Sequence, residues 1–305
     1  MSKTEKLFEW LIDRFTTWAE TRSDIRAAVI VGSRSRVDHP ADEWADLDII
    51  VVTTDPKRYT STADWIENVG NPLLTFIEPT GTGEEKERRV LFEGMLDVDF
   101  AIFPEKKFRE TAQLLTQKKI PPQVIIQISN VFGRGMRILV DKDGMLTQLQ
   151  TLIPSLETPP PEPPTEHEFL ETVNDFLYHA VFTAKHLLRG ELWWTVTCLN
   201  CHMQWLMCRM MEWHAKATYG WNHETWFRGR FLEEWAHPRD LKGLQGAFAH
   251  YNYDDTKHAL LEAMDVFSWI AMETAEKLSY SYPTEIDKRV TEWTKTNLSQ
   301  RGMKK

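Results

Sequence analysis

Apolar residues recur along the chain with two different periods. In the first half they form short β-branched runs, which are typical of strands that are buried on one or both faces. The strongest predicted strands are 27–31, 47–53 and 96–103, and weaker ones are 73–77, 89–92 and 137–140. Ahead of them, residues 7–15 carry apolar side chains at helical spacing. A sheet with at least one flanking helix is therefore expected.

In the second half the spacing becomes that of amphipathic helices. Thr165 followed by Glu168 forms a capping box at the start of the first one, because each side chain can bond a free backbone amide at the helix end. The predicted helices are 166–188, 191–217, 224–235 and 255–278. The second half is expected to be a helical bundle.

A proline-rich stretch separates the two halves. Residues 154–164 read PSLETPPPEPP, in which six of eleven residues are Pro, and such a segment is extended because proline fixes φ and lacks an amide hydrogen. We therefore predict an α+β protein in which a mixed sheet domain (1–153) and a linker (154–164) precede a helical domain (165–305).

Composition narrows the possible functions. The 305 residues include 36 basic and 45 acidic ones, a net charge of −9, and no basic patch stands out, so nucleic acid is not an expected partner. No apolar run reaches the roughly 18 residues that a membrane span needs. The first residues do not resemble a signal peptide. We expect a cytoplasmic protein that acts as a monomer.

Cysteine and tryptophan are concentrated in the predicted 191–217 helix and just beyond it. Residues 198–202 read Cys-Leu-Asn-Cys-His, which formally matches a c-type haem attachment signature, but no export signal accompanies it. Cys201 and His202 would point about 100° apart on an α-helix, so a zinc site is not favoured either. Cys198, Cys201 and Cys208 are expected in the core. Seven of the 13 Trp residues lie between 193 and 235, and most are expected to pack in the bundle.

The sequence from 29 to 52 contains the most informative pattern. A predicted strand ends at Gly32-Ser33-Arg34, and the next begins with Asp46 and Asp48. Strand alternation places both carboxylates on one face, and like charges this close favour a cation between them. Mg²⁺ binds carboxylate and phosphate oxygens. Gly32 would let the backbone approach a phosphate, Ser33 could donate to it and Arg34 could neutralise it.

A third carboxylate lies on another apolar strand. Asp99 is flanked by Val98 and Phe100, and a charged side chain on such an apolar strand is expected to have a function. If the two strands are neighbours, Asp99 would lie beside Asp46 and Asp48 and could either accept a proton or bind a metal. Asp97 shares the face of Asp99 and is an alternative for either role.

This ordered set resembles the polymerase-β-like nucleotidyltransferases and, within them, the aminoglycoside 6-adenylyltransferase (streptomycin adenylyltransferase) family. The resemblance extends to Asp42-Glu43-Trp44 before the carboxylate pair, to 98–104 around Asp99 and to 135–144. In the helical half, 164–169, Asn174-Asp175-Phe176, Ala184-Lys185, 211–214 and 277–283 also fit. Asp97 departs from the family pattern, in which a different residue type usually precedes the third carboxylate.

The resemblance implies transfer of AMP from Mg-ATP to a hydroxyl of an aminoglycoside such as streptomycin, with release of pyrophosphate and resulting antibiotic resistance. It implies that Asp46 and Asp48 hold Mg²⁺, that Asp99 is general base or metal ligand, and that Gly32, Ser33 and Arg34 bind the triphosphate. Lys185 resembles the helical-domain lysine that binds phosphates, with Arg189 as a weaker companion.

Acceptor recognition is expected in the helical half. A polycationic acceptor requires carboxylates and flat aromatic faces, and Asp175 is the first choice for contacting it. Further candidates are Glu171, Glu191, Trp193 and Trp194.

Three other functions compete with this interpretation. An enzyme of the same fold could modify a different small-molecule or protein hydroxyl. A dinucleotide-binding protein or a P-loop kinase is disfavoured because neither Gly-x-Gly-x-x-Gly nor a Walker motif occurs. A non-catalytic binding module would be expected to lack part of the carboxylate set.

Overall fold

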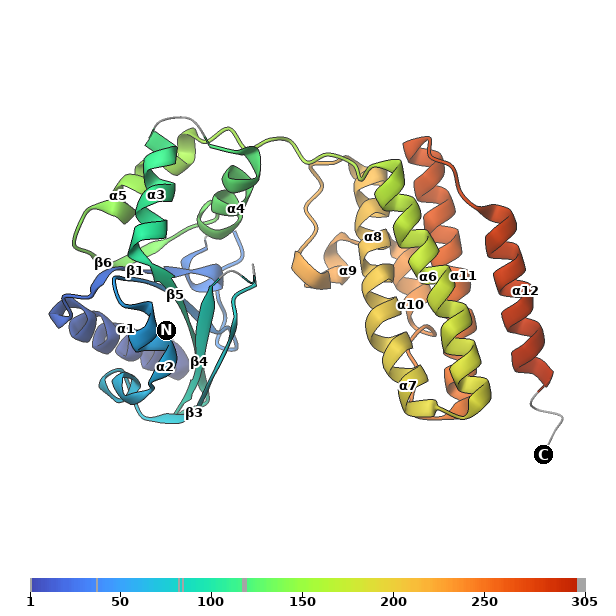
Figure 1. Ribbon diagram of the computed structural model, residues 1–305, viewed down its shortest axis with the longest axis horizontal. Helices are drawn as coiled ribbons and strands as arrows, with labels where there is room; N and C mark the ends of the chain where they lie inside the picture. The colour runs from blue at the N-terminus through green and yellow to red at the C-terminus, as the bar shows by residue number, and fades with distance from the viewer. Residues whose placement is uncertain (1, 37, 82, 84, 117–119, 301–305) are drawn as a thin grey trace. The chain divides into compact units, whose positions relative to one another are not determined.

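A computed structural model describes residues 2–36, 38–81, 83, 85–116 and 120–300 (Figure 1). The chain forms two compact units, Met1–Pro159 and Pro160–Lys305. The division falls inside the proline-rich stretch 154–164. Residues 156–165 form neither helix nor strand.

The first unit is built on a six-stranded mixed sheet, which confirms the predicted class. Its strands are β1 (Ile25–Val31), β2 (Leu47–Thr53), β3 (Pro72–Pro79), β4 (Lys86–Phe92), β5 (Leu96–Pro104) and β6 (Arg137–Asp141). Their order in the sheet is β3-β4-β5-β2-β1-β6. The β2–β5 pair is parallel, whereas the other described pairs are antiparallel. The two strands that carry the predicted carboxylates are therefore neighbours.

Helices cover both faces of this sheet. The helices of the first unit are α1 (Lys3–Thr21), α2 (Pro56–Ser61), α3 (Glu105–Thr116), α4 (Pro122–Phe132) and α5 (Met145–Leu152). On one face, α1 packs Phe8, Leu11 and Phe15 against inward side chains of the strands. On the other face, α3, α4 and α5 form a second apolar layer (Figure 1). A strand such as β2 is thereby buried on both faces, which explains its continuous apolar sequence.

The second unit is helical. Its α-helices are α6 (Glu166–Arg189), α7 (Leu192–Thr197), α8 (Gln204–Tyr219), α9 (Leu232–Trp235), α10 (Pro238–Leu244), α11 (Tyr253–Leu278) and α12 (Thr284–Gln300). The predicted capping box of Thr165 and Glu168 begins α6. Helices α6, α8 and α11 lie together, with the rings of Phe176 and Phe267 stacked at 3.7 Å between centroids (Figure 1). Among the described helices, none is both long and apolar enough to cross a membrane.

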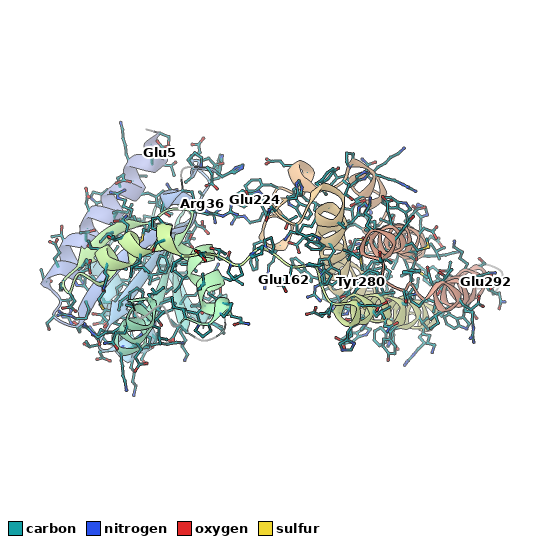
Figure 2. The ribbon with its side chains drawn as sticks, turned by 90° about the horizontal axis from the view of Figure 1, so that it is seen from above. Glu5, Arg36, Glu162, Glu224, Tyr280 and Glu292 are labelled. Atoms are coloured by element: carbon teal, nitrogen blue, oxygen red, sulfur yellow. The ribbon has the colours of Figure 1, made fainter. Side chains whose placement is uncertain are left out.

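A hydrogen bond connects the residues that follow α11 to those that precede α6. The hydroxyl of Tyr280, just after α11, donates to the carbonyl of Pro164 at 2.5 Å. Figure 2 shows Tyr280 close to Glu162, at the start of this unit. The Ser281 amide also donates to Glu166 at 2.7 Å. These bonds fix where the extended proline-rich backbone joins the bundle.

Two predicted helices differ from the structure. Residues 191–217 are not one α-helix, because a π-helix (Cys198–Met203) interrupts it between α7 and α8. Residues 224–235 are mostly irregular, since Arg228 (φ 55°) and Phe231 (φ 53°) have left-handed backbones that end helical turns. Only the short α9 and a single 3₁₀ turn remain there.

The burial of cysteine and tryptophan also differs from expectation. Cys201 is exposed, and Cys198 and Cys208 are partly buried; of the three, Cys198 packs against the core of the bundle. Of the nine Trp residues after 190, only Trp226 and Trp235 are buried. Those more than a third exposed are Trp193, Trp194, Trp205 and Trp293. Core packing therefore explains fewer of the tryptophans than predicted.

Candidate active site

The site begins where β1 ends. Gly32 follows Val31 and opens a short 3₁₀-helix (Gly32–Ser35) with φ +68°. A Cβ atom added to Gly32 would lie 2.1 Å from Oδ2 of Asp48. Both the left-handed backbone and this close approach require glycine here.

Three carboxylates converge beside this turn, and we call Asp46, Asp48 and Asp99 the carboxylate trio. Asp46 immediately precedes β2 and Asp48 is its second residue. Asp48 and Asp99 are directly paired in the parallel β2–β5 ladder. One ligand atom from each of the three lies within 4.8 Å of the others. This spacing and chemistry fit a divalent cation that prefers oxygen ligands.

Asp99 is the most buried of the trio, with 9% of its surface exposed. Burial raises its pKa to about 6, and the charges of Glu87, Asp46 and Asp97 act in the same direction, while Arg89 opposes them. A carboxyl group in such surroundings can hold a proton near neutral pH. Asp97 shares this face but is exposed and lies outside the trio.

Sequence reasoning missed Arg89, which contacts Asp99. Arg89 on β4 is the register partner of Asp99 on β5, and its Nη2 lies 3.2 Å from Asp99 Oδ2. The same guanidinium contacts Glu87 at 3.0 Å and Glu78 at 2.5 Å. The alternation within β4 could have placed Glu87 and Arg89 on one face, but the pairing with β5 was needed to bring them to Asp99.

Ser33 and Arg34 differ in what they contact. Ser33 Oγ is buried and makes no hydrogen bond within the described residues, so it is available to a ligand at this turn. Arg34 donates from Nε to the carbonyl of Asp46 at 2.9 Å and from Nη2 to that of Ala45 at 2.5 Å. Its guanidinium lies 3.6 Å from the centroid of the Phe8 ring, and burial lowers its pKa. Arg34 therefore holds the backbone that positions Asp46.

Lys185 and Asp175 both lie on α6 in the second unit. Lys185 is exposed, and its Nζ is 5.7 Å from the ring centroid of Trp293 on α12. Asp175 accepts from His202 Nε2 at 3.0 Å. Arg189 pairs with Glu191 at 2.8 Å.

Asp175 also lines an acidic groove on the helical unit. The groove has a volume of about 1170 Å³ and is lined by Glu162, Pro163, Pro164, Thr165, Glu168, Glu171, Thr172, Asn174, Asp175, Leu206, Arg209 and Trp213. Its lining therefore includes four carboxylates, one arginine and one tryptophan. Of the candidates named from sequence, Glu171 and Asp175 belong to this groove, whereas Glu191, Trp193 and Trp194 do not line it.

A family model described as streptomycin adenylyltransferase matches residues 5–297. The chain belongs to this family. Three curated proteins named aminoglycoside 6-adenylyltransferase are similar to it along nearly the whole chain. The protein from Bacillus subtilis is 22% identical, covering 93% of this chain and 95% of the relative. The one from Campylobacter jejuni is 23% identical, covering 89% of both.

The third relative, from Staphylococcus aureus, is 22% identical and covers 92% of this chain and 94% of its own. A crystal structure of an aminoglycoside 6-adenyltransferase from Bacillus subtilis has a TM-score of 0.42 and 18% identity, covering 97% of this chain and 98% of that one. Family membership confirms the resemblance inferred from the motifs. The protein is a nucleotidyltransferase enzyme.

Proposed function

We propose that this nucleotidyltransferase moves AMP from Mg-ATP to a hydroxyl group of an aminoglycoside such as streptomycin and releases pyrophosphate. The observation that carries the proposal is the convergence of Asp46, Asp48 and Asp99 within 4.8 Å beside the Gly32 turn. Two further findings support it: membership of the streptomycin adenylyltransferase family and the names of the three relatives.

The site residues of the first unit have distinct proposed roles in binding the metal ion and the nucleotide. Asp46 and Asp48 would hold Mg²⁺, which when bound neutralises charge on the α-phosphate and on the leaving pyrophosphate. Gly32 and Ser33 would bind the triphosphate through the close backbone and the buried hydroxyl. Arg34 would assist by positioning Asp46 and by adding positive charge near the phosphates.

Asp99 is proposed as the general base. The acceptor oxygen forms a bond to the α-phosphorus while the bond from that phosphorus to the bridging oxygen of pyrophosphate breaks. Asp99 takes the proton of the acceptor hydroxyl, which keeps charge in balance. Arg89, 3.2 Å from Asp99, would keep the carboxylate oriented and ionised before the proton moves.

The helical unit would bind the acceptor and assist with the nucleotide. The acidic groove supports a polycationic acceptor, because Glu162, Glu168, Glu171 and Asp175 can pair with amino or guanidino groups. Asp175 is proposed as an acceptor contact and Lys185 as a phosphate contact. We further propose that the enzyme acts as a monomer in the cytoplasm and does not bind nucleic acid. Its net charge of −9 supports the last point, because a negative surface repels phosphate backbones.

The decisive experiment combines the purified protein, ATP and Mg²⁺ with a panel of aminoglycosides. Pyrophosphate release that requires an aminoglycoside, together with an AMP adduct seen by mass spectrometry, is the expected result. Asp48→Asn serves as the inactive control. If no aminoglycoside supports turnover, the acceptor assignment is wrong. The remaining candidate is then a different small-molecule or protein hydroxyl, recognised by the same catalytic unit.

A cellular assay tests the same proposal independently. Expression of the chain in a susceptible bacterium should raise tolerance to streptomycin, and expression of Asp48→Asn should not. Equal tolerance with both would contradict catalytic inactivation of the drug.

A further inference from the structure

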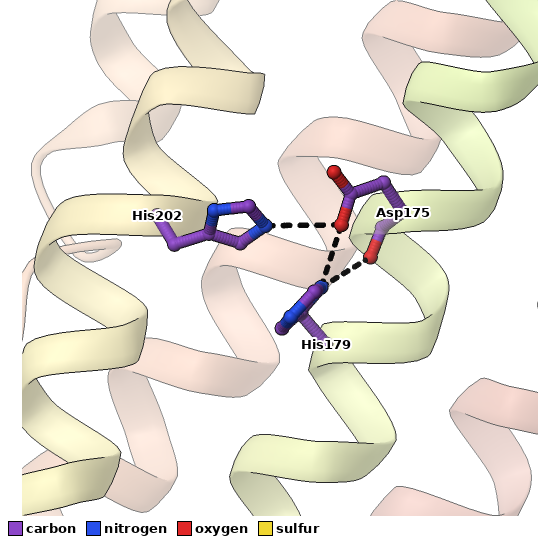
Figure 3. A group of neighbouring side chains, drawn as sticks. All are labelled: Asp175, His179 and His202. Carbon is purple, nitrogen blue, oxygen red and sulfur yellow. Dashed lines mark hydrogen bonds and ion pairs between the residues drawn. The ribbon is translucent and has the colours of Figure 1, made fainter.

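A second group of metal-binding side chains lies in the helical unit. Asp175 and His179 come from α6, and His202 comes from the π-helix (Figure 3). Oδ1 of Asp175 lies 2.6 Å from Nδ1 of His179 and 3.0 Å from Nε2 of His202. All three ligand atoms lie within 4.8 Å of one another. We call these three residues the His-Asp cluster.

The two histidines reach Asp175 by different routes. His179 follows Asp175 by four residues, so both side chains project from the same face of α6. His202 lies in the π-helix Cys198–Met203, whose hydrogen-bonded turn holds one residue more than an α-helix and so rotates the side chains around it. Figure 3 shows the imidazole of His202 directed across to α6. Such single π turns occur frequently at functional sites.

This arrangement suggests a role for the histidine in the Cys-Leu-Asn-Cys-His sequence of 198–202, which formally matches a haem attachment signature. Cys201 is exposed and is not part of the cluster, whereas its neighbour His202 faces two ligands from another helix. The histidine of this motif is therefore explained by residues far away in sequence rather than by the adjacent cysteines.

The donor set selects the class of ion. Two imidazole nitrogens and one carboxylate suit borderline transition metals such as Zn²⁺, whereas Mg²⁺ and Ca²⁺ prefer oxygen ligands alone. Ligands bound at Zn–N and Zn–O lengths of about 2.0–2.2 Å in a tetrahedron lie about 3.3 Å apart. The observed separations of 2.6 and 3.0 Å need a small expansion. Nδ1 of His179 also lies 3.0 Å from the backbone carbonyl of Asp175 and would exchange that contact for the ion.

The cluster is open to solvent, so an ion can enter it from the surface. The side chains of His179, Asp175 and His202 are 27%, 38% and 44% exposed. The imidazole rings of His179 and His202 lie close to each other, with 4.1 Å between their centroids. Three protein ligands and an accessible fourth position for water match the coordination of open zinc sites.

We propose that Asp175, His179 and His202 form a binding site for a divalent transition-metal ion, with Zn²⁺ as the best match. The site goes beyond adenylyl transfer, and its occupancy is measured without nucleotide or acceptor. An ion bound there occupies the carboxylate of Asp175, so metal and a cationic acceptor compete for that residue if both bind it.

The test is a titration of the full-length, metal-free protein with Zn²⁺ in competition with a chromophoric chelator. We expect one saturable site in the helical unit. This site should be retained in Asp48→Asn, a variant that weakens cation binding by the carboxylate trio. His179→Ala and His202→Ala should each reduce the affinity by about tenfold or more, since each removes one of three protein ligands. Circular dichroism verifies that both variants keep the helical fold.

Matched controls separate this site from ordinary surface histidines. His167 lies on the same helix and pairs with Glu171 four residues on, at 3.5 Å. Among the described residues it belongs to no three-ligand group, so His167→Ala should leave Zn²⁺ affinity unchanged. His237→Ala tests the other histidine-containing group, His214, His237 and Asp240, and should also have no effect. The proposal would be overturned by an absence of saturable binding, or by a Zn²⁺ affinity in His179→Ala and His202→Ala that equals that of the unchanged protein.

Co²⁺ provides a second readout. The visible absorption of Co²⁺ is strong when the ion is held in a four-coordinate protein site and weak when it is hydrated. The bands should be lost in His179→Ala and His202→Ala but kept in His167→Ala. Bands that survive in both cluster variants would place the ion elsewhere and contradict the assignment.

Discussion

Asp48 and Asp99 are directly opposite each other in the parallel pair formed by β2 and β5. Their carboxylates are joined by that of Asp46 from the residue before β2. Three negative groups this close repel one another unless a cation lies among them. The catalytic unit is therefore built around a local concentration of charge that its substrate complex is expected to neutralise.

Replacing Asp48 should separate activity from stability. Asp48→Asn is expected to reduce adenylyl transfer by at least about a hundredfold, because it removes a proposed cation ligand. The free energy of unfolding of the cation-free protein should fall by no more than about 0.5 kcal/mol or should rise slightly, because repulsion is relieved. Pyrophosphate release and urea denaturation measure the two effects. The matched variant Asp97→Asn should keep most of the activity; loss there with retention in Asp99→Asn would exchange the proposed roles of these two residues.

Gly32 is expected to tolerate no side chain. Gly32→Ala combines a left-handed backbone with a Cβ atom that would lie 2.1 Å from Asp48 Oδ2, so both stability and transfer should fall. Gly144→Ala is the control, since Gly144 also has a positive φ (+71°), but a Cβ atom added there would meet no described atom within 4 Å. It should cost about 1–2 kcal/mol of stability and leave kcat nearly unchanged. Equal activity in the two variants would contradict a role for the close approach at Gly32.

Asp99 should make stability depend on pH. Its pKa of about 6 in the folded protein is above the ordinary value of about 3.9 for the unfolded chain. The folded state therefore holds the proton more tightly, and the cost of ionising Asp99 is fully present above pH 6 and absent below about pH 4. Asp99→Asn should raise the free energy of unfolding at pH 8 by about 1–3 kcal/mol and have little effect near pH 4, with chelator present. A difference that does not change with pH would show that Asp99 is not the group responsible.

Lys185 can be tested against its neighbour. If Lys185 binds phosphate, Lys185→Ala should raise the KM for ATP, while Trp293→Leu, which removes the ring 5.7 Å from Nζ, should not. The cation–π contact itself is worth only about 0.5–1 kcal/mol at an exposed position, so neither variant should unfold the protein. An unchanged KM in Lys185→Ala would contradict phosphate binding by Lys185 and indicate that it is a surface residue that packs on α12.

A buried group of polar side chains links three helices of the second unit. His214 Nδ1 lies 3.0 Å from Asp240 on α10, and its Nε2 lies 3.4 Å from Glu273 on α11. His214 and Asp240 are fully buried, so His214→Leu leaves the buried side chain of Asp240 without its histidine partner and should cost about 1–3 kcal/mol. The double variant His214→Leu/Asp240→Leu should recover much of that loss. Thermal denaturation checks this; no recovery would mean that packing, not the loss of this polar contact, dominates at this position.

The parts that sequence predicted are those governed by local periodicity. Strand alternation located β2 and β5, and the capping box located the start of α6. The carboxylate trio followed because Asp46, Asp48 and Asp99 stand out as charges on apolar strands. These features depend on residues close in sequence, or on a strand pairing that the motif itself indicates.

The parts that sequence missed depend on long-range pairing. Arg89 reaches Asp99 only through the β4–β5 register, which no local pattern specifies. His202 meets Asp175 because a π-helix interrupts a stretch whose composition indicates a continuous α-helix. The left-handed residues Arg228 and Phe231 end the predicted helix after 224 although neither is glycine, so surrounding contacts override their preference.

The parallel pairing of β2 with β5 also bears on the kinetics of folding. Asp48 and Asp99 are 51 positions apart (99 − 48), and β3 and β4 lie between them in sequence, so closing this pair costs chain entropy before it yields contacts. The same event brings the carboxylates together, which adds electrostatic work to the folding barrier. Divalent cations, mild acid or neutralisation of Asp48 are therefore expected to speed refolding of this unit. The carboxylates that are proposed to bind the cation of the nucleotide therefore also repel one another while the newly made chain folds.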